Sequence, residues 1–292
     1  MFESGSLPRA GATSIAAMPR AIAAALTPFR DNGAEVDDDA LIPYLTFLHD
    51  AGIQGVLLLG TTGEGISCSV PERKRLISNA VNGPLPVLAH CGAQTTADTA
   101  DLAAHAAESG AEAVAVIAPP YYQLDEDALL AHFAAAARAC APLPFYVYEL
   151  EKASGYAIPV SVVERLRELV GNVAGMKVSD APFTKVQPYL LEGLDVYIGA
   201  ESLIGEGLAA GAAGAVSGLA SAFPEVVVEA VRTGDSAAAG ELRTIVERYP
   251  RHAAMKAAVR AKGVPLREDV RGPLRGLTDE ERGSLLSELG LA

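Results

Sequence analysis

The chain alternates between short apolar runs and longer alanine-rich segments, and this alternation is the feature that most restricts its fold. The runs are rich in Val, Ile, Leu and Ala, which is typical of buried strands, and the segments between them have the apolar period of helices. Strands that alternate with helices in this way form parallel sheets. The expected strands are 21–29, 55–60, 86–91, 113–118, 144–149, 173–178, 195–199 and 214–218.

About eight such units follow one another in a chain of 292 residues, and no Gly/Ser-rich linker separates two halves. A closed barrel, which often needs roughly 250 residues, therefore fits better than an open doubly wound sheet. We predict an α/β fold, namely a (β/α)8 TIM barrel with additional C-terminal helices. The barrel would occupy residues 19–233 and the C-terminal helical extension 234–292, after a flexible tail at 1–18.

Charge and cysteine content exclude several classes of protein. The net charge is -13, and no cluster of Lys and Arg is interleaved with aromatic residues, so we expect no nucleic-acid partner. No apolar run approaches the roughly 20 residues that span a bilayer, so we expect no membrane partner. The three cysteines lack the spacing of metal ligands or of a disulfide framework, which favours a cytoplasmic location and no bound metal.

Lys177 lies within the apolar run 173–178, which predicts a buried strand with one charged side chain. A buried ammonium without a partner is costly, so such a lysine tends to lose its proton. The neutral amine can then attack a carbonyl and form an iminium ion. Lys177 is therefore a candidate Schiff-base nucleophile. The alternative is a lysine at a strand end whose ammonium group reaches water.

In a barrel of this kind the reacting groups lie at the C-terminal ends of the strands. The loop Gly60–Gly65 follows the second strand, and its glycines and threonines suit a small carboxylate, although a simple glycine turn would look the same. Tyr148 ends the strand before that of Lys177, where its hydroxyl could shuttle protons. Thr61 and Tyr122 could complete a hydroxyl relay. Taken singly, each tyrosine is more often a packing residue.

Four motifs occur in a familiar order: Gly60-Thr-Thr-Gly-Glu64, Pro120-Tyr-Tyr122, Tyr148 followed by Gly155, and Gly175-Met-Lys177. Together they resemble the motifs of the dihydrodipicolinate synthase / N-acetylneuraminate lyase family of pyruvate-dependent class I aldolases. The resemblance extends from about Ala21 to Leu277. It implies a (β/α)8 barrel, Schiff-base catalysis without a metal or organic cofactor, and pyruvate with an aldehyde as substrates. It also implies a homo-oligomer, either a dimer or a homotetramer.

The resemblance assigns catalytic roles to four residues. Lys177 would form the imine with a 2-oxo acid, and Tyr148 would act as acid and base. Thr61 and Tyr122 would relay protons, with Tyr122 contributed across a dimer interface.

The resemblance also assigns three residues to substrate binding. Thr62 would hold the pyruvate carboxylate. Gly199 and the backbone of Val216 would line the pocket.

One departure from the family pattern bears on the substrate. Synthases of the family follow the tyrosine with Asn-x-Pro-x-Arg-Thr-Gly, whose arginine binds the carboxylate of the second substrate. Here Ala153 takes that arginine's position, and the adjacent Lys152 lacks a bidentate fork. The sequence therefore favours a carbon-carbon lyase, aldolase or dehydratase acting on a 2-oxo acid such as a 2-keto-3-deoxy sugar acid. The alternatives are a 4-hydroxy-tetrahydrodipicolinate synthase, which condenses pyruvate with aspartate semialdehyde, and a non-catalytic 2-oxo-acid binding protein.

Several other polar residues have two interpretations. Glu149 and Glu151 are interpreted as solvated loop carboxylates, with selection of a hydroxylated or cationic acceptor as the alternative. His90 is interpreted as a packed core histidine, with contact to the distal part of a substrate as the alternative. His252 falls on a helical stretch and is interpreted as a surface or internally satisfied residue.

Overall fold

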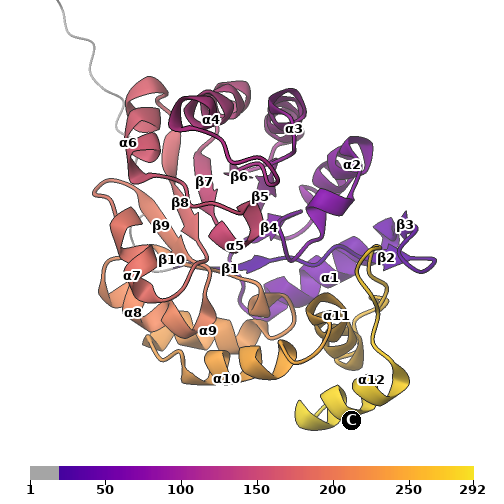
Figure 1. Cartoon of the computed structure of the whole chain (residues 1–292). Coiled ribbons are helices and arrows are strands. Elements are labelled where there is room, and N and C mark those ends of the chain that lie inside the picture. Colours follow the sequence, from indigo (N-terminus) through magenta and orange to yellow (C-terminus); the bar gives the residue numbers. More distant parts are fainter. Residues whose placement is uncertain (1–19) are drawn as a thin grey trace, which may run out of the picture.

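The computed structural model describes residues 20–292, so the expected tail at 1–18 lies outside the described residues. Eight parallel strands form a closed barrel in the order β1-β10-β9-β8-β7-β6-β5-β4, ringed by helices (Figure 1). The predicted (β/α)8 barrel with C-terminal helices is confirmed. Its strands are β1 (Arg20–Ala24), β4 (Val56–Leu58), β5 (Val87–His90), β6 (Ala113–Ile117), β7 (Phe145–Glu149), β8 (Val173–Val178), β9 (Asp195–Ile198) and β10 (Gly214–Ser217).

Three of the helices between the strands begin at capping side chains. Ser69 and Glu72 form a capping box at the start of α2, and the Thr95 and Asp125 side chains accept backbone N–H bonds at the starts of α3 and α4. The helices between the strands are α1 (Asp38–Asp50), α2 (Val70–Ala80), α3 (Thr96–Ser109), α4 (Glu126–Cys140), α6 (Val160–Leu169), α7 (Phe183–Val186), α8 (Ile204–Ala209) and α9 (Pro224–Thr233).

The apolar core has two parts, because successive strand side chains point to opposite faces. In β1, Ala21 and Ala23 pack outward against the helices, whereas Ile22 and Ala24 face the barrel interior. The interior part also contains Val216 from β10 and Tyr197 from β9. The barrel is therefore filled with side chains, and the open space that can hold a ligand lies at its end.

A hairpin and a short helix were not predicted. The first strand ends at Ala24 rather than at residue 29, and the chain continues into a hairpin of β2 (Phe29–Arg30) and β3 (Glu35–Val36). Asp31 and Asn32 in its turn have φ values of 54° and 58°, which these residue types tolerate. After β7 the chain forms a short helix, α5 (Glu151–Ser154). Strands of two residues and a single helical turn are too short to produce a hydrophobic period.

The C-terminal helices α10 (Ala237–Val246), α11 (Arg251–Ala261) and α12 (Asp279–Glu288) lie together on one side of the barrel (Figure 1). The boundary expected at 233/234 falls between α9 and α10, and the division into two domains stays a prediction. Within residues 20–292, none of the helices combines the length and the apolar character needed to cross a membrane.

Candidate active site

Lys177 and Tyr148 lie side by side because their strands are paired in register. β7 and β8 are parallel neighbours, and Tyr148 is opposite Lys177 in their register. The Lys177 amine lies 3.8 Å from the centre of the Tyr148 ring. Both residues are buried, with 6% of Lys177 exposed. The predicted strand around Lys177 is present, and its lysine lies inside the protein rather than at a solvated strand end.

The loop after β4 brings Thr61 to the same place. The Thr61 and Tyr148 hydroxyl oxygens are 3.2 Å apart, within hydrogen-bond distance. The loop is tightly folded: a Cβ at Gly65 would lie 1.8 Å from the Leu59 carbonyl oxygen, so only glycine fits there. Leu59 and Glu64 have φ values of 63° and 53°, an uncommon conformation for residues other than glycine. Neighbouring groups therefore have to hold this loop in shape.

The environment of Tyr148 makes its hydroxyl easier to deprotonate. Burial opposes ionisation, but the positive charge of Lys177 and the hydrogen bond with Thr61 outweigh it. The pKa of Tyr148 is therefore lowered from its ordinary value near 10. A tyrosine with a lowered pKa can move protons to and from a substrate held at Lys177.

A cavity of about 1150 Å³ opens at this end of the barrel. Five of the seven predicted site residues line it: Thr61, Thr62, Tyr148, Lys177 and Gly199.

Ser179, which sequence reasoning missed, also lines the cavity. Its hydroxyl oxygen is buried, and the Ser179 side chain is one of the groups that lower the pKa of Tyr148. A Cβ at Gly199 would lie 1.9 Å from this oxygen, so Gly199 provides the space that Ser179 occupies.

Two predicted site residues lie elsewhere. Val216 is buried in the barrel interior, and Gly218 after the same strand lines the cavity instead. Tyr122 is 67% exposed and packs edge-on against Tyr121, which is 86% exposed, with ring centres 4.8 Å apart. Tyr122 therefore does not reach the cavity of its own chain.

The rim of the cavity is strongly charged. Its cationic side chains come from Lys152, Lys185, Arg243, Arg248 and Arg251, and its acidic ones from Glu151, Asp180, Glu201 and Glu247. Most of these charges are paired; Arg243, for example, bridges Glu201 and Glu247. Arg251 pairs with Glu247 at 3.3 Å, and its buried Nε has no hydrogen-bond partner within the described part of the chain. Ala153 lines the cavity and supplies no charge.

Glu149 is not a solvated loop carboxylate, and that interpretation was wrong. The residue is 1% exposed, and its Oε2 accepts a hydrogen bond from the Ile158 N–H at 2.9 Å. Burial, opposed in part by this bond and reinforced by the nearby Asp180, raises the pKa of Glu149 to about 8. The carboxyl group is therefore mostly protonated at neutral pH. Glu151, by contrast, is partly exposed and pairs with Lys185 at 2.5 Å.

Two histidines contact residues of the site without lining the cavity. His90 is buried, lies edge-on to Tyr148 with ring centres 5.8 Å apart, and donates from Nδ1 to the Leu59 carbonyl. It does not line the cavity, which agrees with a core histidine. His252 on α11 donates from Nε2 to the Thr61 carbonyl at 3.0 Å, a contact that sequence reasoning missed.

No group of three or more His, Cys, Asp and Glu side chains is arranged to hold a metal ion anywhere in residues 20–292. The groups that could contact a small ligand are therefore the hydroxyls, the amine and the charged side chains of the cavity described above.

Comparison with known proteins agrees with this arrangement. Residues 17–290 match the model of the family described as "Dihydrodipicolinate synthetase family". The chain belongs to this family. An uncharacterised DapA-like lyase of Halobacterium salinarum is 35% identical over 89% of this chain and 91% of the relative. A 4-hydroxy-tetrahydrodipicolinate synthase of Methanopyrus kandleri is 30% identical over 92% and 94%.

Among solved structures, Proteus mirabilis N-acetylneuraminate lyase superposes with a TM-score of 0.85 at 30% identity and covers 94% of this chain and 98% of its own. The dihydrodipicolinate synthetase family thus includes relatives named as lyases and as synthases. The chain has the aldolase and lyase fold of this family, and the substrate has to be inferred from its own cavity.

Proposed function

We propose that this protein is a class I lyase or aldolase that forms a Schiff base between Lys177 and a 2-oxo acid such as pyruvate. The observation that carries the proposal is the side-by-side placement of the Lys177 amine and Tyr148, with Thr61 bonded to the tyrosine hydroxyl. The second buried lysine, Lys256, does not line the cavity and is paired with Glu64. Lys177 is therefore the buried amine that a substrate can reach.

In the proposed reaction the Lys177 amine, once it has given up its proton, adds to the ketone carbon of pyruvate. The resulting carbinolamine loses water to give an iminium ion, and Tyr148 supplies and removes the protons that these steps require. Loss of a C3 proton from the iminium ion gives an enamine. The enamine attacks an aldehyde carbon to form the new bond, and water then releases the product from Lys177. Cleavage follows the same steps in reverse.

The rest of the cavity suits a substrate larger than pyruvate. Thr62 is proposed to hold the carboxylate, and Ser179, which also lines the cavity, is proposed to lie near a substrate hydroxyl. The volume of about 1150 Å³ leaves room for a polyhydroxylated chain. Together with Ala153 at the position of the synthase arginine, these features favour a 2-keto-3-deoxy sugar acid, which the enzyme would cleave or dehydrate.

One observation favours the alternative, a 4-hydroxy-tetrahydrodipicolinate synthase. Arg251 lines the cavity, so α11 could supply the guanidinium that is missing at Ala153, and this guanidinium is paired with Glu247 at 3.3 Å. Lys152 also lines the cavity, but it offers only a single charged centre. Condensation with aspartate semialdehyde would depend on Arg251 in this case.

The exposed Tyr121–Tyr122 pair supports a further part of the proposal. We propose that the protein is a homo-oligomer in which Tyr122 of one copy completes the cavity of another. A large exposed aromatic pair is unusual on a monomer surface and typical of an interface.

Borohydride reduction in the presence of pyruvate, followed by peptide mass spectrometry, tests the central step. A stable adduct should form on Lys177 and disappear in Lys177→Met. Lys152→Met, which removes another lysine of the same cavity, should retain it. If neither pyruvate nor other 2-oxo acids give an adduct, the proposed chemistry is wrong and a non-catalytic binding role gains support. Pyruvate release from keto-deoxy sugar acids, compared with consumption of aspartate semialdehyde, then separates the two enzyme functions.

A further inference from the structure

Helix α11 makes two contacts with the loop that carries Thr61. His252 and Lys256 are four residues apart, so they lie on one face of the helix. The His252 Nε2 is 3.0 Å from the Thr61 carbonyl oxygen, and because a carbonyl can only accept, the ring donates. The Lys256 amine is 2.7 Å from Glu64 Oε1. The helix therefore holds both ends of the four-residue segment 61–64.

The contact between Lys256 and Glu64 is fully enclosed. Both side chains have 0% exposure, and the Lys256 amine also donates to the Asp269 carbonyl at 2.7 Å. The other Glu64 oxygen accepts from the Arg271 backbone N–H at 2.8 Å. A buried charge pair contributes little net stability, but its geometry is strict, because neither charge can move away from the other.

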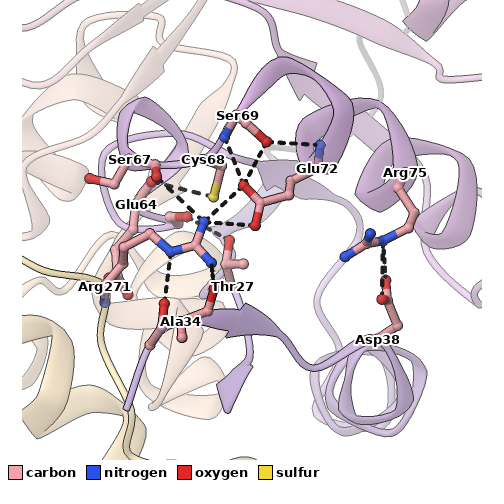
Figure 2. Close-up of polar contacts among 12 residues, drawn as sticks. Thr27, Ala34, Asp38, Glu64, Ser67, Cys68, Ser69, Glu72, Arg75 and Arg271 are labelled. Carbon is pink, nitrogen blue, oxygen red and sulfur yellow. Dashed lines mark hydrogen bonds and ion pairs between the residues drawn. The ribbon is translucent and has the colours of Figure 1, made fainter. Parts of the chain in front are cut away.

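The segment after α11 reinforces the same loop (Figure 2). Arg271 lies between α11 and α12, and its guanidinium bonds to both carboxylate oxygens of Glu72, at 2.8 and 2.9 Å, and to the Ala34 carbonyl at 3.0 Å. Glu72 belongs to the capping box that begins α2, directly after the loop. From the other side, the Thr27 hydroxyl donates to the Gly63 carbonyl at 2.5 Å.

This loop needs external support. Glu64 has a left-handed backbone conformation that is strained for a residue with a side chain, and such conformations persist only when the surroundings impose them. Thr61 at the other end has to keep its hydroxyl 3.2 Å from that of Tyr148. A loop that relaxed would move the Thr61 hydroxyl while leaving Lys177 on its strand unchanged.

We propose that His252 and Lys256 are positioning residues, which hold the Thr61 hydroxyl against Tyr148 and so make α11 part of the control of proton transfer. The inference rests on the proposed function. It separates two steps of that function: imine formation needs Lys177, whereas the rate of proton removal from the pyruvate methyl group depends on the loop.

The test compares His252→Leu and Lys256→Met with wild type in two assays. The first is the end-point yield of the borohydride-trapped pyruvate adduct, and the second is the exchange of pyruvate methyl protons with deuterium, followed by NMR. We expect an unchanged adduct yield and an exchange rate at least about tenfold lower, since a misplaced proton-transfer group costs such factors. His252→Gln, which keeps a donor, should restore most of the rate.

The pH profile of exchange distinguishes positioning from a general loss of structure. The hydrogen bond with Thr61 contributes to the lowered pKa of Tyr148. A loosened loop should therefore move the rising limb of the profile, where Tyr148 loses its proton, to higher pH. Arg260→Met is the matched control, because Arg260 lies one turn further on the same helix and is exposed. Its exchange rate and profile should match wild type.

Lys256→Met leaves the Glu64 carboxylate buried without a partner and can prevent folding. The double variant Glu64→Gln/Lys256→Met removes both charges, and His252→Leu leaves the pair intact, so the inference stays testable. Normal exchange rates and pH profiles in these variants would overturn it, as would an equal loss in Arg260→Met. If the wild-type protein formed no adduct, the proposed function would be wrong, and this inference would be wrong as well.

Discussion

The Lys177 amine lies 3.8 Å from the centre of the Tyr148 ring, because the two residues are directly opposite each other in neighbouring parallel strands. The backbone pairing of the barrel, rather than a flexible loop, therefore fixes the distance between the proposed nucleophile and its acid/base group. Thr61 is different, since it reaches the same point from a loop. The site thus combines a pair of residues held by strand pairing with one residue held by a loop.

Removal of the tyrosine hydroxyl should separate imine formation from proton transfer. In Tyr148→Phe we expect the end-point pyruvate adduct on Lys177 to persist, because the amine and its pocket remain. Exchange of the pyruvate methyl protons should fall by about 10²- to 10⁴-fold, the usual contribution of a general acid or base. NMR measures the exchange. Tyr249→Phe removes a hydroxyl that bonds to Glu288 on α12 and should have no effect; equal rates in the two variants would exclude Tyr148 as the proton-transfer group.

Removal of the charge on Lys177 should raise the pKa of Tyr148. The positive charge of Lys177 is one of the causes that lower this pKa, so Lys177→Met should move the ionisation of Tyr148 to higher pH. Ultraviolet absorbance of tyrosinate reports this ionisation without interference from tryptophan, because the chain has nine tyrosines and no tryptophan. The difference between titrations with and without Tyr148→Phe isolates the residue in each background. An unchanged or lower pKa in Lys177→Met would contradict the proposed coupling.

Glu149 should make stability depend on pH. Its folded pKa of about 8 exceeds the ordinary value of 4.5, so the folded state binds the proton more tightly than the unfolded state. The free energy of unfolding should therefore decrease as pH rises from about 4.5 to about 8. In Glu149→Gln this part of the dependence should disappear, and the variant should be the more stable protein at pH 8. Thermal melting of each protein at pH 6 and pH 8.5 measures this dependence, and Glu192→Gln, which changes an exposed residue, is the control. The same change in melting temperature between the two pH values in all three proteins would contradict the prediction.

Tyr122 should act only in the neighbouring copy of the chain. Lys177→Ala and Tyr122→Phe proteins should each have low activity. In a mixed dimer, the Tyr122→Phe copy retains Lys177 and receives Tyr122 from its partner, so activity should reappear after the two are unfolded and refolded together. Activity assays of the mixture against each protein alone provide the measurement. If Tyr122 acted within its own chain, mixing would restore nothing.

The sequence predicted the barrel and the pair at its centre because those signals are local. An unbroken apolar run around Lys177 indicates a buried strand wherever its partners lie, and the order of the strands then brings Tyr148 next to it. The residues of the Thr61 loop were found for a similar reason, since glycine spacing shows in the sequence. Val216 is not among the residues that line the cavity, since its side chain lies in the interior, and the role of its backbone stays a prediction.

Other features depend on contacts between distant residues and were missed or misjudged. Glu149 is the last residue of a strand, which suggested a solvated position, but residues up to Ile158 fold back over it. Lys256 lies in the run 253–259, whose other members are all apolar, and this is the same signal that identified Lys177. That signal could have revealed a second buried lysine, although not its partner, which is 192 residues away.

The sequence separation of Glu64 and Lys256 has a consequence for biosynthesis. A ribosome makes the catalytic strands and the Thr61 loop long before Lys256, so a nascent barrel holds an acidic side chain whose counter-charge has not yet been translated. Products terminated ahead of α11 would retain that uncompensated charge and a poorly supported loop. Synthesis of α11 is thus a condition for a fully supported Thr61 loop, and fragments released before it would lack that support.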